Sequence, residues 1–503
     1  MQDELTVAVV GAGAMGRGIA QLFAAGGHRV LLTDVRRQAA DEAVAHVHRM
    51  IDRLAGKGRL DDPAAVKERL RTVEEIPAAD LVIEAVVEDL EVKRRLFAEL
   101  EARLGAKTVF VTNTSSLSVT AIAAGLDHPE RLCGLHFFNP VPLMRLVEVV
   151  PGERTDPELP GRLAHLVRRL GHKPIVVTDT PGFLVNHAGR PYTTEALRLL
   201  DEGIAAPADI DRICREAAGF RMGPFALIDL TGLDVNVAVS ESVYRGFYDD
   251  PRLRPSPTGP RRLAASRLGR KTGEGFYRYD DSGRPTPVPE LLAPAYQGTP
   301  VWSEDAQLTS MLRAAGVTVV PEPGPGTVAI VTPWGADVTT AGLDTGLPPQ
   351  RTVGVDPCGG FTGRLTLAAS PATSRAAVAA AHGALAATGH AVSVTSDSAG
   401  FIAQRLLAVI VNTACEIAQL GLASPADIDT AVMLGLGYPH GPLAWGDRIG
   451  PAKVLRVLEG LHTGYRDPRY RPSVWLTRRV HLGMSLRDSP RYPSSAAPRL
   501  PDE

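Results

Sequence analysis

The sequence lacks several features that would place it in a specialised class of protein. Its charges nearly cancel, with 54 Lys and Arg against 56 Asp and Glu, so no basic field favours nucleic acid and no acidic excess indicates a solvating tail. It has no apolar run close to the ~20 residues that a membrane helix needs. The N-terminus, Met1-Gln2-Asp3-Glu4, carries neither a basic nor an apolar leader. We therefore expect a cytoplasmic protein that binds neither nucleic acid nor membrane.

Cysteine is also scarce. Only four occur in 503 residues, and they lie too far apart for a disulfide framework or a metal site: Cys133, Cys214, Cys358 and Cys415. We therefore expect reduced thiols and no metal. The hydrophobic fraction of 44% and the charged fraction of 22% are typical of a globular protein. At ~150 residues per domain, the length allows about three or four domains.

Short apolar runs alternate with helical patterns over the first 180 residues or so. The runs typical of buried strands are Thr6-Val7-Ala8-Val9-Val10, Arg29-Val30-Leu31-Leu32, Leu81-Val82-Ile83 and Val109-Phe110-Val111. Strands separated by helices predict a doubly wound parallel sheet. After Gly182 the pattern changes to long helices as far as about Asp280.

A glycine-rich turn directly follows the first of these strands. The pattern Gly11-Ala12-Gly13-Ala14-Met15-Gly16 opens a helix, and Asp34 ends the second strand. Strand, glycine turn, helix and distal acid together form the dinucleotide-binding fingerprint. Gly11 permits the tight turn, Gly13 lets the backbone approach the pyrophosphate, and Gly16 lets the helix pack closely. The helix N-terminus then faces the phosphate charge.

The acid that follows the second strand indicates which dinucleotide is bound. The Asp34 carboxylate can accept a hydrogen bond from a ribose 2′-OH and would repel a 2′-phosphate, which favours NAD. Arg36 and Arg37 leave NADP open. The residues expected to bind the cofactor through this motif are Gly11, Gly13, Ala14, Met15, Gly16 and Asp34.

An internal repeat organises the rest of the chain. Motifs of the first half recur in the second at nearly one offset: Ala206-Pro207-Ala208-Asp209-Ile210-Asp211 as Ser424-Pro425-Ala426-Asp427-Ile428-Asp429, Gly223-Pro224 as Gly441-Pro442, Asp179-Thr180-Pro181-Gly182-Phe183 as Asp397-Ser398-Ala399-Gly400-Phe401, and Thr108-Val109 as Thr327-Val328. The second half is therefore a degenerate copy of residues ~105–235, without a glycine loop of its own.

The fold class that we predict is α/β. A doubly wound parallel-sheet dinucleotide-binding domain is followed by an all-α domain, then by a degenerate α/β piece and a second all-α domain. The boundaries are residues 1–182 for the NAD-binding Rossmann-like domain, 183–280 for the helical domain, 281–395 for a linker and the degenerate α/β segment, 396–485 for the second helical domain, and 486–503 for a disordered tail.

Several motifs over residues ~5–280 resemble the 3-hydroxyacyl-CoA dehydrogenase family. They are Asn113-Thr114-Ser115-Ser116-Leu117, Gly134-Leu135-His136-Phe137-Phe138-Asn139-Pro140, Leu146-Val147-Glu148, Asp179 to Asn186, Gly219-Phe220-Arg221-Met222-Gly223-Pro224 and Gly269-Arg270-Lys271-Thr272-Gly273. The degenerate second half resembles the longer bacterial members, of the 3-hydroxybutyryl-CoA and phenylacetate-catabolism type. The resemblance implies NAD-dependent oxidation of an (S)-3-hydroxyacyl-CoA to the 3-ketoacyl-CoA.

This reaction needs a base that takes the hydroxyl proton, and the pKa of histidine lies near operating pH. The resemblance gives that role to His136, with Glu148 orienting the ring and stabilising the imidazolium. It places Ser115 and Asn186 where they hydrogen-bond the substrate oxygen or fix its geometry. From the residues alone, His136 beside Phe137 and Phe138 is also compatible with a core histidine, and Ser115 with a turn or helix cap.

The resemblance implies further contacts with small molecules. It places Glu88, Lys93 and Asn113 beside the cofactor. Arg49, Arg53 and Lys57 are spaced four apart and form one basic stripe if the segment is helical. In the family this segment contacts coenzyme A, whose phosphates attract cations, although a solvated basic face has the same pattern.

The second copy lacks all four candidate catalytic residues. By the repeat offset, Ser115 falls opposite Trp334, His136 near Val355-Asp356, Glu148 opposite Leu367, and Asn186 opposite Gln404. We therefore expect the copy to be scaffold. Because the helical domain is where the shorter relatives pair, we expect residues ~396–485 to dock on ~183–280 as an intramolecular pseudo-dimer, and a further homo-oligomer stays open.

Two alternative functions remain at this point. One is a dehydrogenase of a free hydroxy acid or sugar acid, and the other is a non-catalytic relative of the crystallin kind. The sequence leaves the length and polarity of the acyl chain open.

Overall fold

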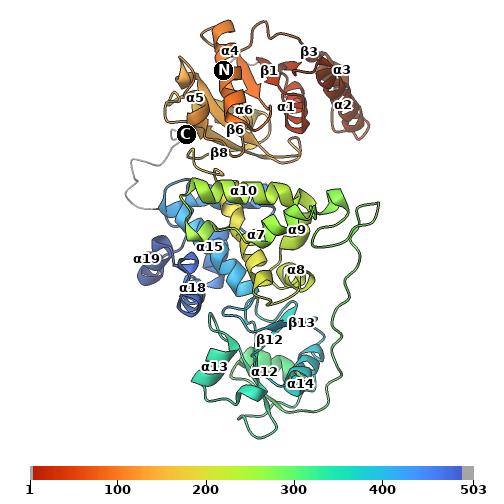
Figure 1. Cartoon of the computed structure of the whole chain (residues 1–503), viewed down its shortest axis with the longest axis vertical. Coiled ribbons are helices and arrows are strands. Elements are labelled where there is room, and N and C mark those ends of the chain that lie inside the picture. Colours follow the sequence, from red (N-terminus) through yellow and green to blue (C-terminus); the bar gives the residue numbers. More distant parts are fainter. Residues whose placement is uncertain (1–3, 490–503) are drawn as a thin grey trace. The chain divides into compact units, whose positions relative to one another are not determined.

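Figure 1 shows the computed structural model of the chain, which describes residues 4–489. The described residues form two compact units. The first comprises residues 4–187 and 421–436, and the second comprises residues 188–420 and 437–489. Among the described residues, no helix combines the length and the apolar character needed to cross a membrane.

The first unit is built on an eight-stranded sheet in the order β3-β2-β1-β4-β5-β6-β7-β8. Its strands are β1 (Thr6–Val10), β2 (Arg29–Thr33), β3 (Leu70–Thr72), β4 (Leu81–Glu84), β5 (Val109–Thr112), β6 (Leu132–Phe137), β7 (Leu146–Pro151) and β8 (Lys173–Val176). All neighbours pair in parallel except β6 and β7. The strand order reverses at β1, the point where such sheets bind ligands. This arrangement confirms the predicted fold class.

Helices with one apolar stripe cover this sheet. They are α1 (Ala14–Ala25), α2 (Arg37–Ala55), α3 (Pro63–Glu68), α4 (Leu90–Arg103), α5 (Val119–Ala123) and α6 (Leu159–Arg169), with the short turn η1 (Pro129–Arg131). In α2 the buried residues Ala40, Ala43, Val47 and Ile51 recur at helical spacing, so one face packs on the core.

The second unit begins within α7 (Val185–Asp201) and is mostly helical. Its first set of helices is α8 (Pro207–Glu216), α9 (Pro224–Thr231), α10 (Leu233–Gly246), η2 (Pro251–Leu253), α11 (Thr258–Ala264) and η3 (Arg270–Thr272). Asp211, the last residue of the repeated Pro-Ala-Asp-Ile-Asp motif, accepts hydrogen bonds from the backbone N–H groups of Phe225 and Ala226 at the start of α9. This cap explains why the motif recurs in both helical domains.

A second sheet, in the order β13-β12-β11-β10-β9, lies in the same unit. Its elements are β9 (Val301–Trp302), α12 (Ala306–Ala314), β10 (Val328–Val331), α13 (Val338–Asp344), η4 (Pro349–Arg351), β11 (Thr352–Val355), β12 (Leu365–Ala369), α14 (Arg375–Ala386) and β13 (Val392–Ser396). From β10 to β13 the pairings are parallel, antiparallel and parallel, as they are from β5 to β8. The predicted degenerate copy is therefore present.

The second helical domain is divided between the two units. Its helices are α15 (Ala403–Gln419), α16 (Pro425–Leu436), α17 (Pro442–Ile449), α18 (Pro451–Tyr465), η5 (Pro468–Tyr470) and α19 (Val474–Leu482). Residues 421–436 belong with the first sheet: the backbone N–H of Thr178 donates to the carbonyl of Leu422, and Gly435 packs against Leu146 and Val185. This segment therefore contacts the first sheet and the start of α7, and the pairing of residues 396–485 with 183–280 stays a prediction.

The expected tail, residues 486–503, begins too early. Leu486 is buried, its backbone N–H donates to Asp447, and its carbonyl accepts from the indole of Trp475. Leu486 is therefore packed, residues 487–489 after it are exposed, and residues 490–503 lie outside the described part of the chain.

An aspartate caps a short helix in each copy, which gives the repeated Asp179 and Asp397 motifs a physical reason. Asp179 accepts from the backbone N–H groups of Val119 and Thr120 at 3.0 and 2.8 Å, at the start of α5. Asp397 accepts from those of Val338 and Thr339 at 2.7 and 3.0 Å, at the start of α13. Each carboxylate thus ties the segment after β8 or β13 to the sheet beside it.

We predict that Asp179→Ala and Asp397→Ala each lower the free energy of unfolding by about 1–2 kcal/mol, because each leaves backbone N–H donors without an acceptor. Urea unfolding measured by circular dichroism tests this. Asp281→Ala, at an exposed position, serves as the control. Unfolding midpoints equal to that of the control would contradict the capping role.

Candidate active site

The glycine loop forms one wall of a pocket of about 740 Å³ at the end of β1. Gly11 has a φ of +105°, a conformation that glycine adopts without strain. A Cβ added to Gly16 would lie 1.8 Å from the Gly11 carbonyl oxygen, so only glycine fits there. A Cβ added to Gly13 meets nothing within 4 Å, so the backbone there is open to a ligand.

The loop and its acid suit an anionic dinucleotide. Helix α1 begins after Gly13 with no side-chain cap and no acidic residue in its first turn, so its N-terminal N–H groups are available to phosphate. Asp34 accepts from the backbone N–H of Ala12 at 2.8 Å and from that of Arg36 at 3.0 Å, which holds its carboxylate at the pocket. Met15 packs against the hydrophobic core instead, so only its backbone faces the loop.

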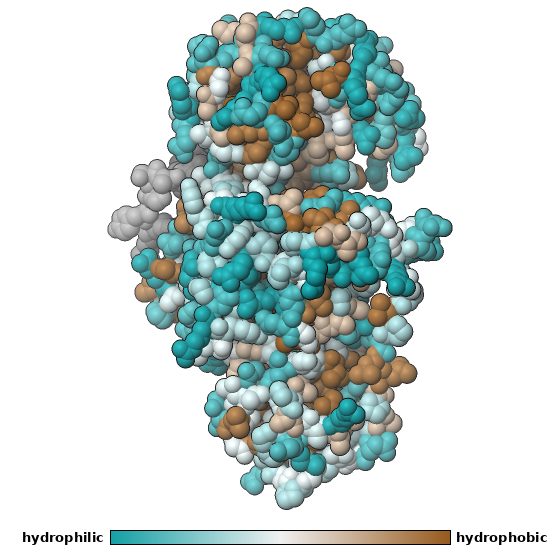
Figure 2. Space-filling model, viewed as in Figure 1, coloured by the Kyte–Doolittle hydropathy of each residue, from teal (hydrophilic) through white to brown (hydrophobic). Residues whose placement is uncertain are grey.

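The apolar part of this pocket is exposed at the surface. Val35, Val87 and Val92 line it and are at least 39% exposed. Figure 2 shows apolar side chains at the surface of the first unit, in the region where Figure 1 draws β1 and α4. Arg36 also lines the pocket, whereas Arg37 pairs with Glu74 at 2.6 Å and is directed to that carboxylate.

A buried ion-pair network supports the far wall of the pocket. Lys93 is 1% exposed, and its Nζ lies 2.6 Å from Glu84 Oε1 and 3.2 Å from Glu88 Oε2. Glu84 is fully buried and also accepts from the backbone N–H of Val86 and the hydroxyl of Thr112. Lys93 therefore positions the loop after β4 from inside the protein. Sequence reasoning missed Glu84, although a carboxylate at the end of a buried strand was a usable signal.

The Asn113–Ser116 turn wraps around the carboxylate of Glu88. Glu88 Oε1 accepts from the backbone N–H groups of Ser115 and Ser116, at 2.8 and 3.0 Å, and from three hydroxyls of the turn. Burial alone would raise the pKa of Glu88, but Lys93 and these hydrogen bonds outweigh it and hold the pKa below its usual value. Asn113 accepts from the backbone N–H of Phe137 at 2.9 Å, which joins this turn to β6.

His136 and Glu148 form the pair that the sequence predicts. They stand opposite each other in the antiparallel pairing of β6 and β7, and His136 Nδ1 lies 2.6 Å from Glu148 Oε2. The side chain of His136 is 7% exposed and that of Glu148 is fully buried. The rings of Phe138 and Phe183 lie 4.3 and 5.7 Å from the imidazole. Because Nδ1 is held by the carboxylate, Nε2 is the nitrogen that can exchange a proton.

Glu148 also fixes the start of α7, and with it Asn186. Its Oε1 accepts from the backbone N–H groups of Leu184 and Val185 at 2.9 and 2.8 Å. One residue further along α7, Asn186 Nδ2 donates to the carbonyl of Ser115 at 3.3 Å. The structure therefore brings all four predicted catalytic residues into one connected group.

A second pocket of the first unit, of about 810 Å³, opens between α1, α2 and the loop after β6. Its cationic lining comes from Arg17, Arg59 and Arg145, beside His46. Burial, together with Arg17, Arg49 and Arg53 nearby, lowers the pKa of His46, so its ring is neutral at pH 7.

The basic stripe lies next to this pocket and does not line it. Arg49, Arg53 and Lys57 are exposed, and α2 ends at Ala55, so Lys57 follows the helix instead of belonging to it. The pocket-facing residues of α2 are His46, Met50 and Leu54, one position round the helix from the stripe.

The corresponding place in the second sheet holds different chemistry. Thr112 pairs with Gly134 in the first sheet and Val331 with Gly354 in the second, which puts Asp356 at the position of His136. The backbone N–H of Asp356 donates to the carbonyl of Thr366, so Thr366 takes the place of Glu148. The expected match of Glu148 with Leu367 is wrong by one residue, because strand pairing and not chain offset sets the register.

Comparison with known proteins places the chain in a family. The model of the 3-hydroxyacyl-CoA dehydrogenase NAD binding domain matches residues 6–180, and that of the C-terminal domain matches residues 182–279 and 400–491. The chain belongs to the 3-hydroxyacyl-CoA dehydrogenase family. This confirms the predicted family, its NAD-binding domain and its reaction class. The C-terminal model matches twice, in agreement with the internal repeat.

Relatives of two lengths resemble the chain. A 3-hydroxyadipyl-CoA dehydrogenase of Escherichia coli is 40% identical over 482 residues, which are 95% of this chain and 98% of that protein. A probable 3-hydroxybutyryl-CoA dehydrogenase of Deinococcus radiodurans is 38% identical over 54% of this chain and 99% of its own length. The crystal structure of a 3-hydroxybutyryl-CoA dehydrogenase from Escherichia coli K12 is 39% identical, covers 96% of this chain and 99% of its own, and superposes with a TM-score of 0.85.

The degenerate site gives a testable pH dependence. Asp356 is buried, with its Oδ1 accepting from Gln404 and the backbone N–H of Cys358, and burial raises its pKa to about 7 from an ordinary value of 3.8. Between about pH 4 and pH 7, the folded state therefore keeps a proton on Asp356 that the unfolded state has released. The stabilisation from this carboxyl is complete below about pH 4 and is lost as the pH rises through about 7.

We predict that Asp356→Asn, which cannot ionise, is more stable than the wild type at pH 8 and loses less stability between pH 5 and pH 8. Urea unfolding at the two pH values measures this. Asp344→Asn, at an exposed position, is the matched control. If Asp356→Asn shows the same pH dependence as the control, Asp356 does not titrate in this range.

Proposed function

We propose that the protein is a cytoplasmic enzyme that uses His136 as the general base when it oxidises an (S)-3-hydroxyacyl-CoA to the 3-ketoacyl-CoA with NAD. The observation that carries the proposal is the 2.6 Å contact of His136 Nδ1 with the buried Glu148, because it aligns the ring and leaves Nε2 for the substrate hydroxyl. The four cysteines are free thiols, as a reducing compartment favours.

The residues of the first pocket fit NAD. The open backbone at Gly13 and the uncapped start of α1 would hold the pyrophosphate, and Asp34 would accept from a ribose hydroxyl. Bound NAD supplies the hydride acceptor for the reaction. Glu88, Lys93 and Asn113 act from behind this site, since they shape the loop and the turn that border it.

The protein's own part in the reaction is proton transfer and alignment. His136 Nε2 takes the proton of the substrate hydroxyl, and the Glu148 carboxylate stabilises the imidazolium through Nδ1–H. Ser115 and Asn186 lie beside this group and orient the substrate oxygen. Glu148 remains anchored by two backbone N–H groups throughout, so the ring keeps its position.

The second pocket of the first unit supports coenzyme A as the activating group. Its volume of about 810 Å³ and its three lining arginines suit a large ligand that carries phosphates. The exposed Arg49 and Arg53 lie beside its rim on α2 and add to the positive potential. A free hydroxy acid or sugar acid, which is the alternative substrate class, carries one carboxylate and no phosphate, so it would use only part of this large cationic pocket.

The acyl chain is short in this proposal. Among the Escherichia coli matches to almost the whole chain, the curated relative is named for a six-carbon dicarboxylic acyl group and the crystal structure for a four-carbon acyl group. We therefore place 3-hydroxybutyryl-CoA and 3-hydroxyadipyl-CoA ahead of long-chain thioesters.

We also propose that the two helical domains pair as an intramolecular pseudo-dimer. A further repeat, which sequence reasoning missed, supports it: Asp250-Pro251-Arg252-Leu253-Arg254-Pro255-Ser256 recurs as Asp467-Pro468-Arg469-Tyr470-Arg471-Pro472-Ser473. The contacts between the two copies are reciprocal. Arg252 donates to the carbonyl of Arg471, and Arg469, the counterpart of Arg252, donates to that of Arg254.

The ion pairs and rings of this contact follow the same symmetry. Arg471 pairs with Asp250 at 2.8 Å and Arg254 with Asp467 at 3.5 Å. Phe220 and its counterpart Tyr438 meet edge to face, with their ring centroids 5.0 Å apart. Reciprocal contacts of this kind are what two identical subunits make across a two-fold axis.

We predict that the protein forms NADH from 3-hydroxybutyryl-CoA or 3-hydroxyadipyl-CoA and has no measurable activity on free 3-hydroxybutyrate. Absorbance at 340 nm with each substrate gives kcat/KM. Long-chain 3-hydroxyacyl-CoA in the same assay tests the chain length. Comparable kcat/KM for the free acid would reject the coenzyme A requirement.

We predict that His136→Gln lowers kcat by about 10²–10⁴-fold, because no base remains to take the hydroxyl proton. Glu148→Gln lowers it as well, since an amide cannot stabilise the imidazolium. Isothermal titration calorimetry with NADH shows whether the cofactor still binds, as it should. Arg103→Gln, in an exposed pair with Glu75, is the control. Turnover close to the wild type in a homogeneous preparation of His136→Gln would remove His136 from the mechanism.

A further inference from the structure

The contact between the two helical domains contains a fully buried cation. Arg405 on α15 is 0% exposed, and its Nε donates to Glu195 Oε1 at 2.5 Å. Its Nη1 and Nη2 donate to Glu202 at 2.7 and 3.0 Å, and both also reach tyrosine hydroxyls, those of Tyr465 and Tyr470. Both carboxylates belong to the first helical domain, Glu195 on α7 and Glu202 just after it, whereas Arg405 and the tyrosines belong to the second.

This network has no counterpart on the other side of the pseudo-two-fold axis. With the repeat offset, Arg405 corresponds to His187, and Glu195 to Thr413. Glu202 corresponds to Leu420, and Tyr470 to Leu253. On one side of the axis, the contact therefore contains Glu195, Glu202 and Arg405. On the other side, the equivalent positions hold neither these carboxylates nor the guanidinium.

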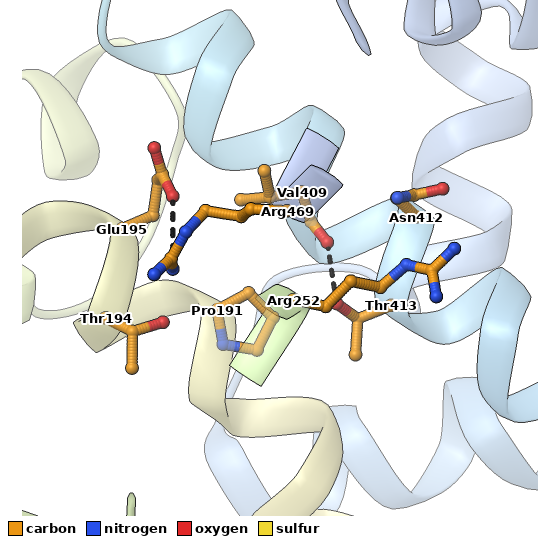
Figure 3. A pocket seen from close by; sticks show the side chains of 8 residues that line it. All are labelled: Pro191, Thr194, Glu195, Arg252, Val409, Asn412, Thr413 and Arg469. Atoms are coloured by element: carbon orange, nitrogen blue, oxygen red, sulfur yellow. Dashed lines mark hydrogen bonds and ion pairs between the residues drawn. The ribbon is translucent and has the colours of Figure 1, made fainter. Parts of the chain in front are cut away.

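The small cavity of Figure 3, of about 10 Å³, makes the asymmetry visible. Its eight lining residues are four repeat-related pairs: Pro191 with Val409, Thr194 with Asn412, Glu195 with Thr413, and Arg252 with Arg469. Arg469 lies 3.9 Å from Glu195, as the dashed line in Figure 3 marks. On the other side, Thr413 donates its hydroxyl to the carbonyl of Val409, and Arg252 lies 3.3 Å from a different carboxylate, that of Glu416.

We propose that this one-sided network makes the pairing directional, so that the first helical domain accepts the second and rejects a copy of itself. In a pair of two first domains, Glu195 and Glu202 would face His187 in place of Arg405. A histidine has at most two N–H groups and cannot serve these carboxylates as the guanidinium does. In a pair of two second domains, Arg405 would face Thr413 and Leu420 in place of Glu195 and Glu202, and Glu416, the counterpart of Arg198, would be the one acid left on that face of α15.

The network thus stabilises the contact within one chain, and it also disfavours pairing between like domains of two chains. The inference rests on the proposed pairing but not on the reaction. None of its charged residues touches the group formed by His136, Glu148, Ser115 and Asn186, so kcat provides an independent control for the site.

The test uses the full chain with the triple variant Glu195→Gln/Glu202→Gln/Arg405→Met, which keeps the side-chain shapes and removes the charges. Each protein is unfolded in guanidinium, refolded at a series of concentrations, and sized by light scattering after gel filtration. We expect the wild type to regain its native mass at every concentration. The triple variant should form intermolecularly paired species whose share rises with concentration, while its kcat stays at the wild-type value.

Thermal unfolding separates this role from simple stabilisation. Arg405→Met alone leaves two carboxylates unpaired and should lower the Tm by about 10 °C, and the triple variant should recover at least half of that loss. Glu241→Gln/Arg245→Gln, an exposed pair on α10, is the matched control for both readouts.

A triple variant that refolds to the wild-type mass at every concentration would overturn the proposal, as would a wild type that refolds into mixed assemblies. If the triple variant does not fold, Arg405→Lys takes its place. Lysine keeps the charge but cannot pair with both carboxylates. We therefore expect a smaller share of intermolecularly paired species, which still rises with concentration. A mass equal to that of the wild type at every concentration again overturns the proposal.

Discussion

The buried carboxylate of Glu148 is the interaction on which the active site depends. A fully buried anion is costly unless hydrogen bonds compensate it, and the Glu148 carboxylate has three hydrogen-bond partners. Its Oε1 holds the first turn of α7 through two backbone N–H groups, and its Oε2 holds His136. Because the antiparallel pairing of β6 and β7 sets these side chains opposite each other, sheet register, helix start and catalytic geometry are fixed together.

The second copy shows which parts of this arrangement belong to the fold and which to the chemistry. It keeps the glycine and the phenylalanine with positive φ that lead into the long helix, at Gly400 and Phe401 as at Gly182 and Phe183. At the positions of His136 and Glu148, the pair that we propose to be catalytic, it has Asp356 and Thr366, whose Oδ2 and Oγ1 are buried without hydrogen-bond partners among the described residues. The second copy therefore keeps the backbone features that the fold needs. It has lost the histidine–glutamate pair, which only the proposed reaction needs.

Features encoded in one stretch of chain could be predicted from the sequence, and features assembled from distant stretches could not. The strand that begins at Thr6, the glycine turn and the aspartate of the repeated motif all follow local rules. The Glu84–Lys93 pair was missed because Lys93 was expected to face the cofactor, whereas the fold turns it inward to Glu84 at the end of a buried strand. The pocket beside α2 was missed for a related reason: the three arginines that line it are separated in sequence, whereas the stripe that periodicity reveals is solvent-exposed.

Fusion of two copies in one chain changes what the contact between them can contain. In a symmetric dimer each residue of the interface occurs twice, so a buried Glu195 would need a partner on both sides of the axis. Within one chain the two copies differ in sequence, and a single arginine, Arg405, can be placed against carboxylates that only the other copy carries. The second copy therefore need not retain catalysis to be selected. In the proposed pairing, its helical face supplies the buried cation that the carboxylates of the first copy need.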